Sequence, residues 1–277
     1  MQSDNKLKLS FTKVSTFLNC RQKYAWEYIE NLTTKDKSRA LKIGDIVHQL
    51  LHLYLLKELD LEAIQDLNKV LDVVKASYTT EDDLLALEIA SESSILVSGY
   101  LHEFANDPLD LLPGETILET DMGDYILTGR VDAWARSNDD QKLWRIEYKT
   151  TAKTDSHYLQ GLKSGLQGAI YDFLSETLFK EELAGTIYNL IVKTKIPKYQ
   201  RAFTRCNRSA IERMLKTVDG VYRDIQRNDL YPSSKCYSYA SECPYKVLCE
   251  FDSPGTREAF FTRRKEVHIE PIVDSVD

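Results

Sequence analysis

The chain contains few of the residues that dominate fibrous and disordered proteins: only 11 of its 277 residues are glycine and 7 are proline. With 43% hydrophobic and 29% charged residues, this scarcity excludes a collagen-like, low-complexity or wholly disordered protein. The sequence also lacks an apolar run of about 18 residues and an apolar signal core at its start, so neither a membrane span nor secretion is expected. We therefore expect a folded cytoplasmic protein.

Cysteine is scarce as well, with five in all, and a chain of this length can bury a core that needs no disulfides. In a reducing compartment, clustered cysteines indicate metal binding or catalysis. Three of the five, Cys236, Cys243 and Cys249, lie close together near the C-terminal end. A fourth ligand could come from Cys206 or, across the chain, from Cys20. This pattern predicts a zinc site or an iron–sulfur cluster, and the spacing does not decide between them.

Negative charge is concentrated in one block. The net charge is −7, yet residues 61–125 alone contain two basic and fifteen acidic residues, which is net −13. The flanking segments 1–60 and 126–277 are each net +3. Because binding depends on the local field more than on the total charge, basic surfaces outside the block can still attract phosphates. Nucleic acid remains a candidate partner.

Hydrophobic periodicity predicts a helical N-terminal part followed by an α/β core. The expected helices span 10–31, 41–59, about 61–76, 81–106, 156–182 and 208–228. The expected strands span 116–119, 125–134, 143–150 and 186–194. A cysteine-bearing loop follows residue 232, and residues 251–277 show no clear period. This order of elements favours an α/β fold with a mixed sheet.

A candidate catalytic group lies on two of the predicted strands. Glu147 and Lys149 are two residues apart, so both side chains project from one face of strand 143–150. A short turn would place the strand that contains Asp132 antiparallel beside it. Two carboxylates can hold a hard divalent cation that supports phosphodiester hydrolysis, while a nearby lysine stabilises the transition state. The alternative is a surface salt bridge between alternating Glu and Lys residues.

Three more side chains extend this group. His48 lies on an otherwise apolar predicted helix, where it is either packed or a ligand. Gln167 and Tyr171 are four residues apart, hence on one face of the helix that follows the lysine strand. Both could contact phosphate or water. The alternative is a partly buried pair whose polar ends are solvated.

Six motifs follow one another along the chain: Cys20, Gly44-x3-His48, Gly129-Arg130-Val131-Asp132, Ile146-Glu147-Tyr148-Lys149-Thr150, Gln167-x3-Tyr171 and the three C-terminal cysteines. In this order they resemble the PD-(D/E)XK nuclease superfamily. The resemblance is specifically to the RecB-like branch with an iron–sulfur cluster, which includes CRISPR-associated exonucleases, helicase–nuclease subunits and phage relatives. It covers residues 10–249.

The resemblance implies a restriction-endonuclease-like fold: a mixed central β-sheet flanked by helices, with a helical N-terminal part and a C-terminal cysteine-rich loop. We expect a single nuclease domain over 1–250, followed by a tail at 251–277. Within the domain, 61–112 would form an acidic helical insertion, and 232–250 a loop that binds a cluster together with Cys20.

The resemblance also implies roles for individual residues. Magnesium or manganese would be held by His48, Asp132, Glu147 and the carbonyl of Tyr148. The catalytic residues would be Asp132, Glu147, Lys149, Gln167 and Tyr171. A structural 4Fe–4S cluster, or zinc as the alternative, would be bound by Cys20, Cys236, Cys243 and Cys249, with Cys206 left out.

The chain departs from the family pattern at three points. Val131 replaces the proline of the superfamily name, which matters little because the following aspartate supplies the ligand. Many relatives have Cys-x2-Cys-x5-Cys, whereas here position 240 is alanine and the first thiol is Cys236, which leaves the nuclearity of the cluster open. The sequence has no P-loop Gly-x4-Gly-Lys-Ser/Thr, so a helicase would be a separate partner.

We therefore expect a divalent-metal-dependent DNA nuclease, an exonuclease that favours single strands. It would act in recombination, repair, replication or DNA processing, in the cytoplasm of a prokaryote or of a phage-infected host cell. The alternative is a catalytically inactive DNA-binding or complex-assembly protein with a zinc or iron–sulfur structural site. The intact set of Asp132, Glu147 and Lys149 disfavours that alternative.

Overall fold

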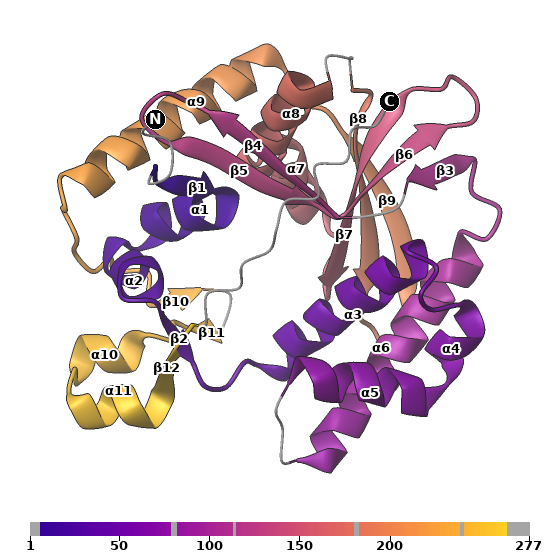
Figure 1. Ribbon diagram of the computed structural model, residues 1–277, viewed down its shortest axis with the longest axis horizontal. Helices are drawn as coiled ribbons and strands as arrows, with labels where there is room; N and C mark the ends of the chain where they lie inside the picture. The colour runs from indigo at the N-terminus through magenta and orange to yellow at the C-terminus, as the bar shows by residue number, and fades with distance from the viewer. Residues whose placement is uncertain (1–5, 79–81, 113–114, 180–182, 239–240, 265–277) are drawn as a thin grey trace. The chain divides into compact units, whose positions relative to one another are not determined.

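A five-stranded sheet carries three of the seven residues predicted to form the active site, Glu147, Tyr148 and Lys149 (Figure 1). The computed structural model describes residues 6–78, 82–112, 115–179, 183–238 and 241–264. The chain divides into a first unit, residues 1–37, 119–129 and 211–277, and a second unit, residues 38–118 and 130–210. The five-stranded sheet belongs to the second unit.

The sheet is mixed, as the order of elements predicted. Its strands follow the order β3 (Leu109–Leu112), β6 (Ala133–Ser137), β7 (Leu143–Thr151), β8 (Gly185–Val192) and β9 (Lys198–Thr204). The central pair β7 and β8 is parallel, and every other neighbouring pair is antiparallel. The sequence analysis missed both edge strands, β3 and β9. An edge strand can face water and so needs no continuous apolar run, which removes the periodicity signal.

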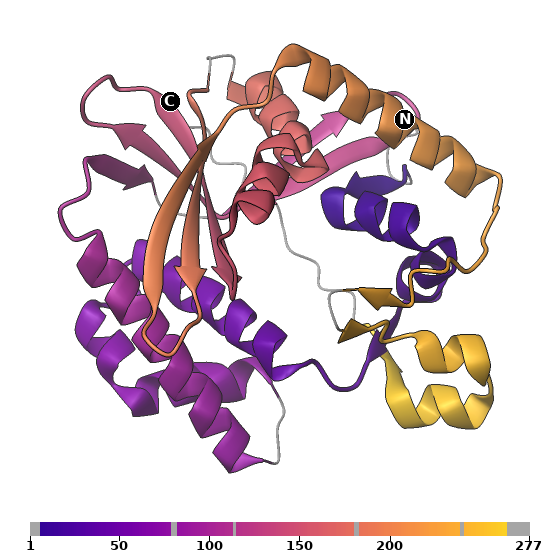
Figure 2. The ribbon, with the colours of Figure 1, turned by 180° about the vertical axis from the view of Figure 1, so that it is seen from behind.

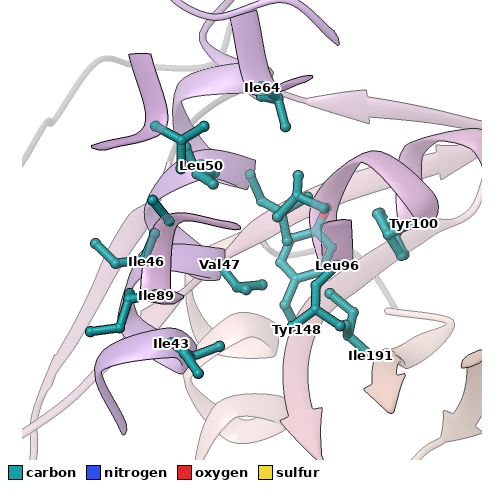
Figure 3. Close-up of a cluster of buried hydrophobic side chains, with 14 of the residues drawn as sticks. Ile43, Ile46, Val47, Leu50, Ile64, Ile89, Leu96, Tyr100, Tyr148 and Ile191 are labelled. Carbon is teal, nitrogen blue, oxygen red and sulfur yellow. The ribbon is translucent and has the colours of Figure 1, made fainter. Parts of the chain in front are cut away.

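Helices cover both faces of this sheet (Figures 1 and 2). On one face lie α3 (Arg39–Leu55), α4 (Leu61–Gln65), α5 (Leu67–Ser77) and α6 (Asp83–Glu103). Figure 3 shows side chains of α3 and α6 packed around Tyr148 of β7 and Ile191 of β8. The helices of the acidic segment 61–112 thus contribute to the core of the second unit. The other face, with Tyr188 and Leu190, is covered by α7 (Ser156–Ser164).

Helix α6 is long and apolar enough, by length and composition alone, to cross a membrane. Its residues Ala86, Ile89, Leu96, Val97 and Tyr100 are buried in the core against α3, α5 and the sheet, as in the core helix of a folded domain.

Three predicted helices are interrupted, each at a residue with extended backbone. The helix expected at 10–31 ends at Cys20, the one at 61–76 is split at Asp66, and the one at 156–182 is split at Gly165. Cys20 and Asp66 cap the helices that follow them, because each side chain accepts a backbone N–H. At Gly165 a Cβ would lie 2.8 Å from the carbonyl oxygen of Gly161, so this close turn requires glycine. Residues 180–182 of the last expected helix lie outside the described residues.

The strand expected at 125–134 is also two strands. β5 (Ile126–Val131) pairs in parallel with β1 (Lys8–Ser10) in a three-stranded sheet that also contains β4 (Thr116–Asp121). β6 begins after Asp132 and belongs to the five-stranded sheet. The sequence pattern cannot reveal that β5 and β6 belong to different sheets, because the alternation of buried and less buried residues continues from one strand into the other.

The first unit is mostly helical and has a small core of its own. It contains α1 (Phe11–Asn19), α2 (Arg21–Tyr24), a π-helix (Ala25–Ile29), most of α9 (Arg208–Gln226), α10 (Lys246–Glu250) and α11 (Pro254–Phe260). Its short strands are β2 (Leu32–Thr34) paired with β12 (Phe261–Arg263), and β10 (Tyr237–Ser238) paired with β11 (Ser241–Glu242). Trp26, Tyr245 and Phe261 stack in this core. Residues 254–263, for which the sequence shows no clear period, thus form a helix and a strand, whereas 265–277 lie outside the described residues.

Candidate active site and cysteine cavity

Glu147, Lys149 and Gln167 form a closed hydrogen-bonded triangle. The Lys149 ammonium donates to Oε1 of Glu147 at 2.6 Å and to Oε1 of Gln167 at 3.2 Å. The Gln167 amide donates to the same Glu147 oxygen at 2.9 Å. Glu147 is buried, while Lys149 keeps part of its surface exposed. The predicted pair therefore meets the predicted glutamine of α8 (Leu166–Phe179).

Asp132 and His48 form a second pair beside this triangle. One carboxylate oxygen of Asp132 accepts the backbone N–H of Tyr148 at 2.8 Å, and the other lies 3.4 Å from Nδ1 of His48. The Tyr148 side chain points to the opposite face of β7, where its ring meets the ring of Tyr100 edge-on. Tyr148 thus contributes its backbone to the site and its side chain to the core.

The charges of these groups act on one another. Burial lowers the pKa of His48, but the hydrogen bond and charge of Asp132 and the charge of Glu147 raise it by more, so its pKa lies above the usual value. Burial likewise lowers the pKa of Lys149, and the charges of Glu147 and Asp132 more than compensate. Burial raises the pKa of Asp132, yet His48 and the Tyr148 N–H depress it overall. The site is therefore an array of paired charges.

Close packing of α3 on β7 brings His48 to Asp132. Gly44 makes this approach possible, because a Cβ at that position would lie 3.1 Å from the Oγ1 of Thr150. One helical turn later His48 lies over Tyr148, with the two rings edge-on and their centres 6.3 Å apart. In the Gly44-x3-His48 motif, the glycine thus allows the helix to pack closely on β7, and this close packing places His48 beside Asp132.

A buried arginine beneath the site was missed in the sequence analysis. Arg145 is 1% exposed; it donates to Thr186 and lies 3.3 Å from a carboxylate oxygen of Asp172. Its guanidinium lies 4.8 Å from the ring centre of Tyr171. Burial and the charge of Glu147 raise the pKa of Tyr171, whose ring packs on this guanidinium. A signal was present, because strand alternation places residues 145, 147 and 149 on one face.

Breaking the Arg145–Asp172 pair should destabilise the protein strongly. Arg145→Leu leaves a buried carboxylate without its cation, and we expect a loss of about 3–5 kcal/mol in the free energy of unfolding, measured by urea denaturation. Removing both charges with Arg145→Leu and Asp172→Leu should recover much of that loss. Lys142→Met, which breaks the exposed pair with Asp140, is the matched control and should barely shift the midpoint. Equal effects of the buried and exposed substitutions would contradict this account.

Four of the five cysteines line a single cavity of about 230 Å³ in the first unit: Cys20, Cys236, Cys243 and Cys249. Cys20 begins α2, and Cys249 lies in α10. Burial raises the pKa of the Cys243 and Cys249 thiols, and the neighbouring cysteines raise both further. Cys206 lies in the second unit, buried beside Asp172, and its pKa is raised to about 11. The structure therefore groups the four predicted cysteines and separates the fifth.

The donors in both places suit the groups that the sequence analysis expected. Oxygen donors with one imidazole nitrogen suit magnesium or manganese, and four sulfur donors suit an iron–sulfur cluster or zinc. Within the part of the chain that the structure describes, no three His, Cys, Asp or Glu side chains are drawn together at metal-ligand spacing. In the candidate active site, the Lys149 ammonium contacts one oxygen of Glu147 and the His48 imidazole one oxygen of Asp132.

Comparison with solved structures shows the fold. The crystal structure of a candidate exonuclease from Eubacterium rectale is similar, with a TM-score of 0.54 and 12% identity, over 90% of this chain and 94% of that one. The crystal structure of SSO0001 is more distant, with a TM-score of 0.39 and 16% identity over 90% of this chain and 88% of that one. A search of curated proteins found no significant match.

Comparison with family models gives the assignment. The model of the PD-(D/E)XK nuclease superfamily matches residues 8–250, which include every residue of the triangle, the Asp132–His48 pair and the four cysteines. The mixed sheet flanked by helices is consistent with its restriction-endonuclease-like fold. The chain belongs to the PD-(D/E)XK nuclease superfamily.

Proposed function

We propose that the protein is a divalent-metal-dependent DNA nuclease, an exonuclease that prefers single strands and acts in DNA recombination, repair, replication or processing. The observation that carries this proposal is the hydrogen-bonded triangle of Glu147, Lys149 and Gln167 beside the Asp132–His48 pair. The similarity of fold to a candidate exonuclease supports the exonucleolytic mode.

In this proposal Asp132, Glu147, His48 and the carbonyl of Tyr148 hold magnesium or manganese. The bound ion would offset charge on the phosphodiester and make water a better nucleophile. Lys149, which keeps its proton because its pKa is raised, supplies a positive charge to the scissile phosphate. Gln167 holds the ammonium and the Glu147 carboxylate in place by hydrogen bonds to both, and the buried Tyr171 packs on the Arg145 guanidinium.

The four cysteines would bind a 4Fe–4S cluster, with zinc as the alternative. Their shared cavity joins the start of the first unit to its C-terminal part, from Cys20 to α10. The bound cluster or zinc ion would stabilise the fold of the first unit, because its ligands come from separate elements of that unit. A helicase or another DNA-processing protein would be a separate chain.

Cleavage should require a divalent cation, and manganese should support it better than magnesium. The reason is His48, since an imidazole nitrogen suits manganese better than magnesium. The purified protein would be incubated with end-labelled single- and double-stranded DNA in manganese, in magnesium or with a chelator. We expect shortening from the ends of single strands, fastest with manganese and absent with the chelator. Cleavage that persists in the chelator would refute the metal-dependent mechanism, and binding without cleavage in both metals would favour an inactive DNA-binding protein.

A further inference from the structure

Helix α6 carries two apolar stripes on opposite sides. Successive residues of a helix are rotated by about 100°, so positions 86, 89, 93, 97 and 100 form one side, and positions 84, 87, 91 and 95 form the other. The first side is buried in the core. On the second side, Leu84 is 67% exposed and Ile95 is 56% exposed, with Leu87 and Ser91 between them. A helix that is apolar all round is normally covered on all sides, and this one is covered on one side only within the described part of the chain.

The second stripe forms part of a groove. A cavity of about 680 Å³ lies between α6, the start of α3 and α5, and the turn that joins β8 to β9. Leu87 and Ile95 line it from α6, and Leu67 lines it from α5. In the turn, the 78% exposed Ile196 lies between Lys195 and Pro197, which both line the cavity. These exposed apolar side chains are contiguous rather than scattered, which is typical of an interaction surface.

Charged side chains of both signs border the groove. Arg39 lies between two carboxylates of α6, 3.3 Å from Glu88 and 2.7 Å from Glu92. Lys193 and Lys195 form the wall made by the β8–β9 turn. A nucleic acid fits this groove poorly, because its walls are aliphatic and charged rather than aromatic and because two carboxylates face the space a phosphate would take. A protein surface with alternating apolar, acidic and basic positions fits better.

A second copy of this chain has such a surface. If two α6 helices cross antiparallel with Ser91 at the two-fold axis, Leu87 of one copy lies opposite Ile95 of the other. Glu88 of one copy then lies at the level of position 94 of the other, on the side of α6 that faces the groove, which Lys193 and Lys195 also line. The small Ser91 side chain at the axis allows the two backbones to approach. An interface of this kind is self-complementary, as a two-fold dimer requires.

We propose that the exposed stripe of α6 is the contact between two copies of this chain in a two-fold dimer. The two stripes would contact each other around Ser91, and Glu88 of each copy would pair with Lys193 or Lys195 of the other. This proposal does not rest on the proposed nuclease function, because none of these residues belongs to the active site.

The oligomeric state of the full chain tests this proposal. We expect the wild-type protein to be a dimer in light scattering coupled to size exclusion. Leu87→Asp and Ile95→Asp should each weaken dimerisation on the order of 100-fold, because each substitution enters a two-fold interface twice and buries an unpaired charge there. Leu178→Asp is the matched control: it replaces a 51% exposed leucine of the same unit, on α8 and outside the stripe, and should leave the dimer intact.

A charge exchange tests the arrangement without relying on the apolar variants. Glu88→Lys and Lys195→Glu should each weaken the dimer, and the double variant should restore it, since the exchanged charges attract again across the axis. Melting temperatures would confirm that all variants remain folded. The proposal is overturned if the wild type is monomeric at its highest soluble concentration, if the stripe variants dimerise as tightly as the Leu178→Asp control, or if the double variant is weaker than both single variants.

Discussion

Lys149→Ala should lower the rate of DNA cleavage by about 10²–10⁴-fold, because it removes a charged donor from the reacting phosphate. Asp132→Ala should be at least as severe, since it removes a proposed metal ligand and the acceptor of the Tyr148 N–H. Rates would be measured on end-labelled single-stranded DNA in manganese, with protein in excess over substrate so that the cutting step is observed directly. DNA affinity, measured by fluorescence anisotropy with the chelator present, should change far less than the rate.

Lys153→Ala is the matched control for Lys149→Ala. Lys153 follows the same strand, and its exposed side chain lies outside the triangle. It should keep wild-type cleavage and at most reduce affinity through the loss of one positive charge. A Lys149→Ala variant that cleaves at the wild-type rate would show that the triangle is a structural salt bridge, and the proposed mechanism would fail.

Serine in place of Cys20, Cys236, Cys243 or Cys249 should remove most of the bound iron and sulfide and lower stability together. A cluster held by these residues would link segments more than two hundred positions apart in sequence, much as a long-range disulfide does. By that analogy we expect each substitution to cost about 2–4 kcal/mol in the free energy of unfolding. Anaerobically purified proteins would be compared by iron and sulfide content, visible absorbance and thermal unfolding.

Cys206→Ser separates this effect from the loss of any buried thiol. Cys206 belongs to the second unit and does not line the cavity, and burial raises its pKa to about 11, so it stays protonated. Its substitution should leave the iron and sulfide content unchanged. Protein that contains zinc without iron or sulfide would replace the cluster by a four-thiolate zinc site, and protein that contains neither would leave the four cysteines without a metal role.

Local pattern was sufficient to predict the central strands and the Glu147–Lys149 pair. β7 combines an apolar alternation with Glu147 and Lys149 on one face, and both properties are set within nine consecutive residues. The antiparallel neighbour was predicted because a short turn separates the two strands, and the structure pairs Ala133 with Ile146. Such features depend on short-range geometry, which a sequence states directly.

Features set by distant contacts could not be predicted in this way. The change of sheet at Asp132 depends on β1, more than a hundred residues away, which pairs with β5. From the sequence alone, Arg145 would be expected at the surface. It is buried because α8 packs over it and supplies Asp172 and Tyr171 as its partners. His48 likewise joins the site through the close contact of Gly44 with Thr150. The family resemblance implied a role for His48, but neither it nor periodicity predicted the change of sheet or the buried Arg145.

Gly165, whose backbone is extended between α7 and α8, makes the orientation of α8 independent of the length of α7. In one continuous helix, an added residue upstream would turn every later side chain by about 100° and carry Gln167 and Tyr171 away from Glu147. At Gly165 this rotation is not passed on, because the backbone there is extended and a separate helix begins at Leu166. Insertions or deletions in α7 can therefore change the surface beside the candidate active site while Gln167 and Tyr171 keep their orientation on α8.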